Sequence, residues 1–358
     1  MADVADPHTP EAPIHVGSLL TGNDVKTFER SVDYRVLNAS AASTFNVEFK
    51  SDSTRRGGHF SPKWGAVFSN LFMGKYAGVS DLEVHLPEST SDRLQLARTG
   101  LFFALSRHKG LDKSQIDSSL SASFNRWSQD WVPADFDEPL FRFRGEDPAV
   151  QPDLLETDLL AFLNPNYSPR ESEGEDIDAV TYPWLREIFT KALVPNVTVR
   201  KDLMEDTGVA ITELLNNIRD HSRIGYAGLS NISMFATGST ARDGRIYISV
   251  LDNGVGMPAT LPGKSIKTQP AEQVVDAFNG DLARRERGRG DGLFTVRKLA
   301  EKYRGTLFVA TGPTEGDQTV VIDCDFAIAS TVEAACHTIP VQGTVVVVSL
   351  PMARLTNS

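Results

Sequence analysis

A carboxylate and a carboxamide stand four residues apart in the stretch ITELLNNIRDHS, residues 211–222. In a helix this spacing places Glu213 and Asn217 on one face, one turn apart, with Leu214 and Ile218 on the apolar side. A carboxylate next to an amide can act as a water-activating base beside a Mg²⁺ ligand. The alternative is an amphipathic helix whose polar face has no chemical role.

A second segment, residues 245–258, combines a predicted strand with a glycine-containing turn. RIYISVL is rich in β-branched residues, which predicts a buried strand, and Asp252 follows at its end. Gly254 and Gly256 allow a sharp turn and the close approach of a flat ligand. Taken alone, DNG is also typical of a simple turn after a strand.

A third segment, RGRGDGLFTVRKL at residues 287–299, has alternating glycines directly ahead of a helical pattern. A glycine loop that opens a helix presents backbone N–H groups and the positive end of the helix dipole to phosphate. One glycine triplet is weak evidence, because turns are rich in glycine. The order of the three segments, with a helix first and a glycine loop last, predicts a nucleotide-binding site.

Together these segments resemble the N, G1 and G2 boxes of the superfamily of gyrase, heat-shock chaperone, histidine kinase and MutL ATPases (GHKL). GTLFVAT at 305–311 is similar to the strand after the G2 helix, and GTVVVVSLP at 343–351 is similar to the closing strand. The resemblance covers residues 176–352. It implies a histidine kinase-like ATPase domain with the Bergerat-type fold, an α/β sandwich in which a mixed sheet carries helices on one face.

The same resemblance implies roles for individual residues, with ATP and Mg²⁺ as ligands. Asn217 would bind Mg²⁺, and Glu213 would activate the attacking water or hydroxyl group as the catalytic residue. Asp252 would accept a hydrogen bond from the adenine amino group. The rest of the nucleotide-binding set would be Gly254, Gly256, Met257, Gly288, Arg289, Gly290, Gly292 and Leu293.

Residues 259–287 correspond to the ATP lid of the family, a mobile cover over the triphosphate. Residues 271–278, AEQVVDAF, predict a short helix within this span. Arginines at 284, 285, 287 and 289 lie next to the predicted phosphate loop and could neutralise phosphate charge. The alternative is a solvated basic loop.

Three features depart from the pattern of the histidine kinases. The ending DHS is closer to the anti-sigma-factor serine kinases, since Asp220 stands where many histidine kinases have lysine. Asp291 lies inside the glycine loop, where an acid near phosphate is unfavourable unless it faces away. An insertion at 313–342 contains a strand-like run, residues 319–326, and both cysteines.

The first half of the chain predicts a mobile lead at 1–30, a small α/β domain at 31–110 and an irregular connector at 111–175. Strand patterns at 43–49 and 82–86 flank a helix pattern at 64–73. The small domain weakly resembles a degenerate STAS-type (anti-anti-sigma-factor) domain. An acidic run at 171–178 predicts a solvated linker.

Composition limits the class of protein and its partners. The 358 residues are 41% hydrophobic and 23% charged, as in ordinary globular chains of about two domains. A net charge of −11 disfavours binding to nucleic acid or to anionic membrane. Two cysteines form no disulfide framework, and no stretch could span a bilayer. We therefore expect free thiols in a cytoplasmic protein.

The resemblance and composition together leave several functions open. The first is a Mg-ATP-dependent regulatory protein, an ATPase or serine/threonine kinase acting on a protein partner in bacterial signalling. The second is a nucleotide-gated protein-binding module with little turnover. A histidine kinase is disfavoured because none of the seven histidines is followed by an acid. An ATP-driven clamp would require a lysine from a further domain. A homodimer remains open.

Overall fold

The computed structural model describes residues 14–17, 26, 45–50, 62–73, 82–85, 140–145, 157–163, 201–221, 228–236, 244–261, 269–281, 291–313, 318–339 and 341–351. The predicted acidic linker at 171–178 lies outside these residues.

The largest feature is an eight-stranded sheet with the order β10-β9-β8-β11-β7-β6-β5-β4. Its strands are β4 (Leu140–Gly145), β5 (Thr157–Leu163), β6 (Gly228–Ala236), β7 (Gly244–Asp252), β8 (Thr306–Gly312), β9 (Thr319–Asp325), β10 (Ala334–His337) and β11 (Gly343–Pro351).

Every neighbouring pair in this sheet is antiparallel. The prediction of a mixed sheet is therefore wrong. Short connections join β6 to β7 and β8 to β9, and strands joined this way must run antiparallel, whereas a parallel pair needs a long crossover. β11 then returns between β7 and β8, antiparallel to both.

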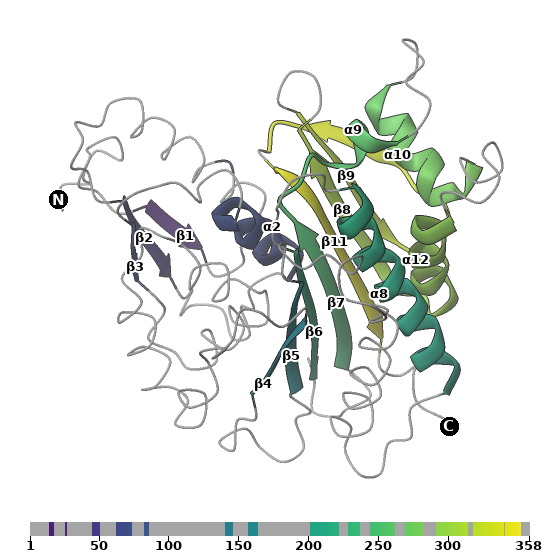
Figure 1. Ribbon diagram of the computed structural model, residues 1–358, viewed down its shortest axis with the longest axis horizontal. Helices are drawn as coiled ribbons and strands as arrows, with labels where there is room; N and C mark the ends of the chain where they lie inside the picture. Colours follow the sequence, from purple (N-terminus) through teal and green to yellow (C-terminus); the bar gives the residue numbers. More distant parts are fainter. Residues whose placement is uncertain are drawn as a thin grey trace, which may run out of the picture.

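Three helices cover one face of the sheet: α8 (Lys201–His221), α10 (Pro270–Asn279) and α12 (Asp291–Lys302) (Figure 1). Alternate residues of the central strands point to this face, as the period of a strand requires. These strand residues join the core beneath the helices: Ile248, Val250, Leu307, Val309, Val346 and Val348. The predicted helix is confirmed over residues 211–221 of α8, and the predicted strand at 245–251 is confirmed as part of β7.

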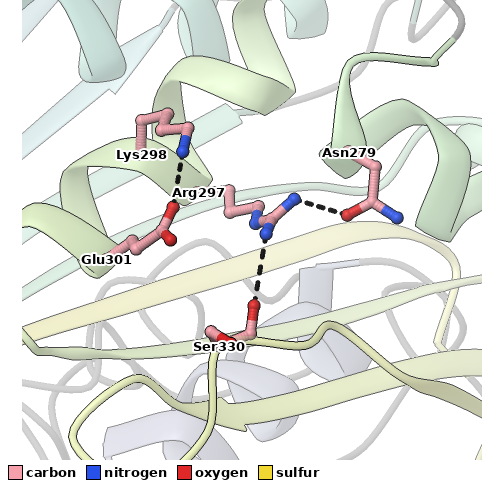
Figure 2. A network of polar contacts seen from close by, with 5 residues as sticks. All are labelled: Asn279, Arg297, Lys298, Glu301 and Ser330. Atoms are coloured by element: carbon pink, nitrogen blue, oxygen red, sulfur yellow. Dashed lines mark hydrogen bonds and ion pairs between the residues drawn. The ribbon is translucent and has the colours of Figure 1, made fainter.

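Polar contacts fix α12 against its neighbours. The Arg297 guanidinium donates to Oδ1 of Asn279 at the end of α10 and to the carbonyl of Ser330. Within α12, Lys298 pairs with Glu301 at 2.7 Å (Figure 2). Because Arg297 bridges α12, α10 and the segment after β9, these three elements form one packed unit.

A second, three-stranded sheet lies in the N-terminal half of the chain. It has the order β1-β2-β3, with both pairs parallel. The strands are β1 (Ile14–Gly17), β2 (Phe45–Lys50) and β3 (Leu82–His85), and the helix α2 (Pro62–Met73) lies between β2 and β3 in the chain. The predicted strands are confirmed over the described residues 45–49 and 82–85, and the predicted helix at 64–73 is confirmed as part of α2. The prediction of a mobile lead is wrong at 14–17, because these residues pair with β2.

Helix α2 packs between the two sheets (Figure 1). On one side Phe68 meets Phe49 of β2 edge to face, with ring centroids 6.3 Å apart. On the other side Trp64 meets Phe308 of β8 at 5.3 Å. Phe308 alternates with the core residues of β8, so α2 lies on the face opposite α8 and α12. The predicted arrangement of helices on one face of the C-terminal sheet is seen for α8, α10 and α12, whereas α2, from the N-terminal half of the chain, covers the opposite face.

The predicted irregular connector at 111–175 contains two strands of the large sheet. β4 pairs with β5, and β5 pairs with β6, both antiparallel. The prediction is wrong at these segments. LFRFRG alternates aromatic residues with arginine over β4, which is the period-2 pattern of a half-buried strand.

The segment at 313–342 extends the sheet and its core. The strand-like run at 319–326 is confirmed as β9, and β10 pairs with it. Cys324 is buried and joins the core, Cys336 is exposed, and both thiols are free, as predicted. Among the described helices, none has the length and apolar character needed to cross a membrane.

Candidate nucleotide-binding site

The end of β7 places a buried carboxylate in a glycine turn. Asp252 is the last residue of β7, and its side chain is 8% exposed. Its Oδ1 accepts a hydrogen bond from the N–H of Gly254 at 2.7 Å. Gly256 has φ +77°, and a Cβ there would lie 2.5 Å from the carbonyl oxygen of Gly312. The turn therefore requires glycine at 256, because a side chain would collide with the end of β8.

Burial shifts the protonation of this carboxyl group. Desolvation raises the pKa of Asp252 from 3.8 to about 7, and hydrogen bonds from the backbone N–H groups of Gly254 and Thr344 oppose the rise. Buried acids with strongly shifted pKa values gather at functional sites.

Two residues outside the predicted set surround the glycine turn that follows Asp252. Gly343 has φ +87°, and a Cβ there would lie 2.6 Å from Oδ1 of Asp252. Thr311 accepts a hydrogen bond from the N–H of Met257 at 2.8 Å and donates to the carbonyl of Gly343 at 3.2 Å. Both lie in strands whose motifs were recognised, at 305–311 and 343–351. Their place around this turn follows only from strand order.

The first turn of α12 meets the polar face of α8. Glu213 and Asn217 are half-buried on α8, one turn apart. A Cβ on Gly292 would lie 2.5 Å from Oε2 of Glu213. The structure therefore brings together Glu213 and Gly292, which are far apart in the sequence.

A polar cluster fixes the opposite end of this helix pair. Lys302, the last residue of α12, contacts Asp206 of α8 at 2.5 Å and Asp202 at 3.4 Å. The hydroxyl of Tyr303 donates to Asp206 at 2.8 Å. These contacts set how α12 lies along α8 and hence where Gly292 meets Glu213.

The region that contains these residues matches a known family. Residues 206–354 match the histidine kinase-, DNA gyrase B-, and HSP90-like ATPase family. This region carries a GHKL-type ATPase domain. The matched residues run from within α8 to just past β11, so α2, β4 and β5 lie outside them. No curated protein matches the chain.

Two predicted nucleotide-binding residues of the GHKL domain have their side chains in its core. Met257 is 9% exposed and Leu293 is 7% exposed, and both belong to the core beneath the helices. Gly288, Arg289 and Gly290 lie outside the described residues.

The span predicted as the ATP lid contains the predicted helix, α10. Its Val274 and Phe278 are fully buried and pack in the core. An αL glycine, Gly280, ends the helix with φ +75°. The predicted helix within this span is therefore confirmed as α10, which packs into the core of the domain.

Asn70 of α2 hydrogen-bonds to the backbone of Asp252. Nδ2 of Asn70 donates to the carbonyl oxygens of Asp252 and Gln342, each at 2.7 Å, and its Oδ1 accepts from the N–H of Gln342 at 3.3 Å. The side chain is fully buried. No sequence pattern pointed to Asn70, because 182 residues separate it from Asp252.

Proposed function

We propose that the chain binds Mg-ATP and transfers the γ-phosphate to water or to a serine or threonine hydroxyl of a protein partner in bacterial signalling. The GHKL-type domain at 206–354 supports ATP binding. The observation that carries the proposed chemistry is the contact between Glu213 and the first turn of α12. A candidate base thus lies at the N-terminal end of a helix, where the phosphates would bind.

The environment of Asp252 fits an adenine base. In its ionised form the Asp252 carboxylate accepts hydrogen bonds strongly, and the adenine amino group is a donor. Guanine has a carbonyl oxygen at the corresponding position, and two acceptors would face each other. Asp252 would therefore bind the base and favour adenine over guanine.

The N-terminus of α12 fits the phosphates. The first backbone N–H groups of a helix have no partner within it, and the helix dipole favours negative charge there. Asp291 and Gly292 begin α12. The adjacent carboxylate of Glu213 would take the proton from the attacking water or hydroxyl group.

Magnesium fits the residues present without a dedicated cage. Within the described residues, no group of three or more histidine, cysteine, aspartate or glutamate side chains could hold a metal ion. Mg²⁺ bound with a triphosphate takes most ligands from phosphate and water and needs only one or two protein oxygens. The side-chain oxygen of Asn217 would supply one. When bound, Mg²⁺ neutralises phosphate charge.

The fate of the γ-phosphate tests the proposal. ATP labelled in its γ-phosphate is mixed with the purified protein, Mg²⁺ and a cell lysate. We expect acid-stable label on a lysate protein or release of free phosphate, with Glu213→Ala reducing either while leaving ATP binding intact. Equal turnover in Glu213→Ala would remove Glu213 from the chemistry.

Asn217→Ala should lose the Mg²⁺ dependence of ATP binding.

One observation favours a second function, a nucleotide-gated protein-binding module with little turnover. Asn70 links α2, and with it the N-terminal sheet, to the backbone of Asp252. ATP occupancy could thereby alter a partner surface on the N-terminal sheet. In the same experiment, label remaining on intact, tightly bound ATP would support this function over phosphate transfer.

A further inference from the structure

We propose that α2 completes the adenine subsite, with Asn70 as a positioning residue that holds Asp252 and the start of β11 in the arrangement that binds the base. This inference rests on the proposed function, because it requires Asp252 to contact adenine. It assigns part of the nucleotide site to a helix outside the matched residues 206–354.

The Asn70 amide joins two segments that flank the Asp252 carboxylate. Its Nδ2 donates to the carbonyl of Asp252 and to the carbonyl of Gln342, and its Oδ1 accepts from the N–H of Gln342. Gln342 immediately precedes Gly343, whose backbone lies against the Asp252 carboxylate. Asn70 thus fixes both the residue that would bind the base and the backbone beside it.

These hydrogen bonds lie at the point where the pairing of β7 with β11 ends. β7 and β11 pair up to Asp252 and Thr344, and Gln342 lies beyond the last pair. Backbone groups buried without a partner are costly, and Asn70 supplies partners at this point. A side-chain amide is the group that fits, because it has two donors for the two carbonyls and an acceptor for the N–H.

Other residues anchor α2 elsewhere on the sheet. Lys63 pairs with Asp323 of β9 at 2.5 Å, and Trp64 packs on Phe308 of β8. These contacts hold the same helix on the same sheet face but touch neither Asp252 nor Gln342. Lys63→Ala is therefore a matched control that weakens the packing of α2 on the large sheet and leaves the hydrogen bonds of the Asn70 amide unchanged.

The test measures binding to the full chain by titration calorimetry, with Mg-ATP, adenosine and tripolyphosphate as separate probes. We expect Asn70→Leu to weaken the affinities for ATP and adenosine at least about tenfold. Its affinity for tripolyphosphate should stay within about twofold of that of the unaltered protein. Lys63→Ala should leave all three unchanged. If Asn70→Leu does not fold, Asn70→Ser, which replaces the amide by a smaller hydroxyl group, should weaken the affinity for adenosine in the same direction.

The outcomes separate this inference from the proposed function. Absence of ATP binding in the unaltered protein would overturn the proposed function itself. If the unaltered protein binds ATP, wild-type affinity for adenosine in the folded Asn70 variants would overturn only the role of Asn70. Equal weakening of adenosine and tripolyphosphate would also overturn it, because a general loss of structure does not distinguish the two ends of the nucleotide.

Discussion

The carboxylate of Glu213 lies against the backbone of Gly292, where a Cβ would stand 2.5 Å from Oε2 and 3.1 Å from the Cβ of Glu213. The missing side chain at Gly292 is what allows α8 to present this carboxylate to the first turn of α12. Glycine is otherwise unfavourable inside a helix, by about 0.5–1 kcal/mol relative to alanine. The close approach of the Glu213 side chain is a physical reason for glycine at position 292.

We expect Gly292→Ala to fold and to lower turnover. The added methyl group must displace the Glu213 side chain, while alanine itself favours the helix. Misplacing a catalytic group by about 1 Å can cost on the order of a hundredfold in rate. Phosphate release under saturating ATP is the measurement.

The matched control is the double variant Glu213→Ala with Gly292→Ala. If the methyl group acts through Glu213, the second change should add little to the loss caused by the first. If the two changes lower turnover independently, so that their effects multiply in the double variant, Gly292 would act on the phosphates directly and not through Glu213.

Asp252→Asn should alter the pH dependence of stability. Burial raises the pKa of this carboxyl from 3.8 to about 7, so the fold favours its protonated form. That stabilisation is fully present below about pH 4 and is lost as the pH rises to about 7. The shift of about 3 pKa units corresponds to roughly 4 kcal/mol.

Denaturant unfolding of the nucleotide-free protein between pH 4 and pH 8 measures this effect. In Asp252→Asn the fall in unfolding free energy across that range should be smaller than in the unaltered protein. Asp325→Asn, which removes an exposed carboxylate, serves as the control. An unchanged profile in Asp252→Asn would contradict the raised pKa.

Thr311→Val should destabilise the turn after Asp252. The hydroxyl of Thr311 accepts from the N–H of Met257 and bonds Gly343 and Thr344. Valine has the same shape but leaves the buried N–H of Met257 without this partner, which costs about 1–3 kcal/mol. Thr306→Val, at the other end of the same strand, should cost less. Equal costs would mean that the hydroxyl of Thr311 contributes nothing specific.

Trp64→Ala should destabilise the GHKL domain, although Trp64 lies far outside the matched residues. It removes the ring that packs on Phe308 of β8. Removal of a large aromatic side chain from a packed interface costs about 3–5 kcal/mol when fully buried, and Trp64 is half-buried. We therefore expect about 2 kcal/mol by chemical denaturation. Unaltered stability would show that α2 does not support the sheet.

The local motifs of the site could be predicted from the sequence. Glu213 and Asn217 share a helix face because of their spacing, and Asp252 ends a strand because a β-branched run stops there. These features depend on neighbours within a few residues, which sequence patterns record.

What could not be predicted depends on contacts between distant segments. The strand order that brings Gly343 to Asp252 follows from tertiary pairing, and so does the antiparallel sheet. α2 was expected to belong to a separate domain, because its apolar pattern does not say that it packs on two sheets. The bonds from Asn70 to Asp252 follow from that packing.

Binding of ATP with its base at Asp252 is the step on which the proposed function depends, and equilibrium binding of Mg-ATP tests it most directly. Titration calorimetry of the unaltered full chain and of folded Asp252→Asn is the measurement. We expect saturable binding by the unaltered chain and at least about a hundredfold weaker binding by the variant, a difference of about 2.7 kcal/mol. Equal affinity in the two proteins, or no binding by either, would contradict the account.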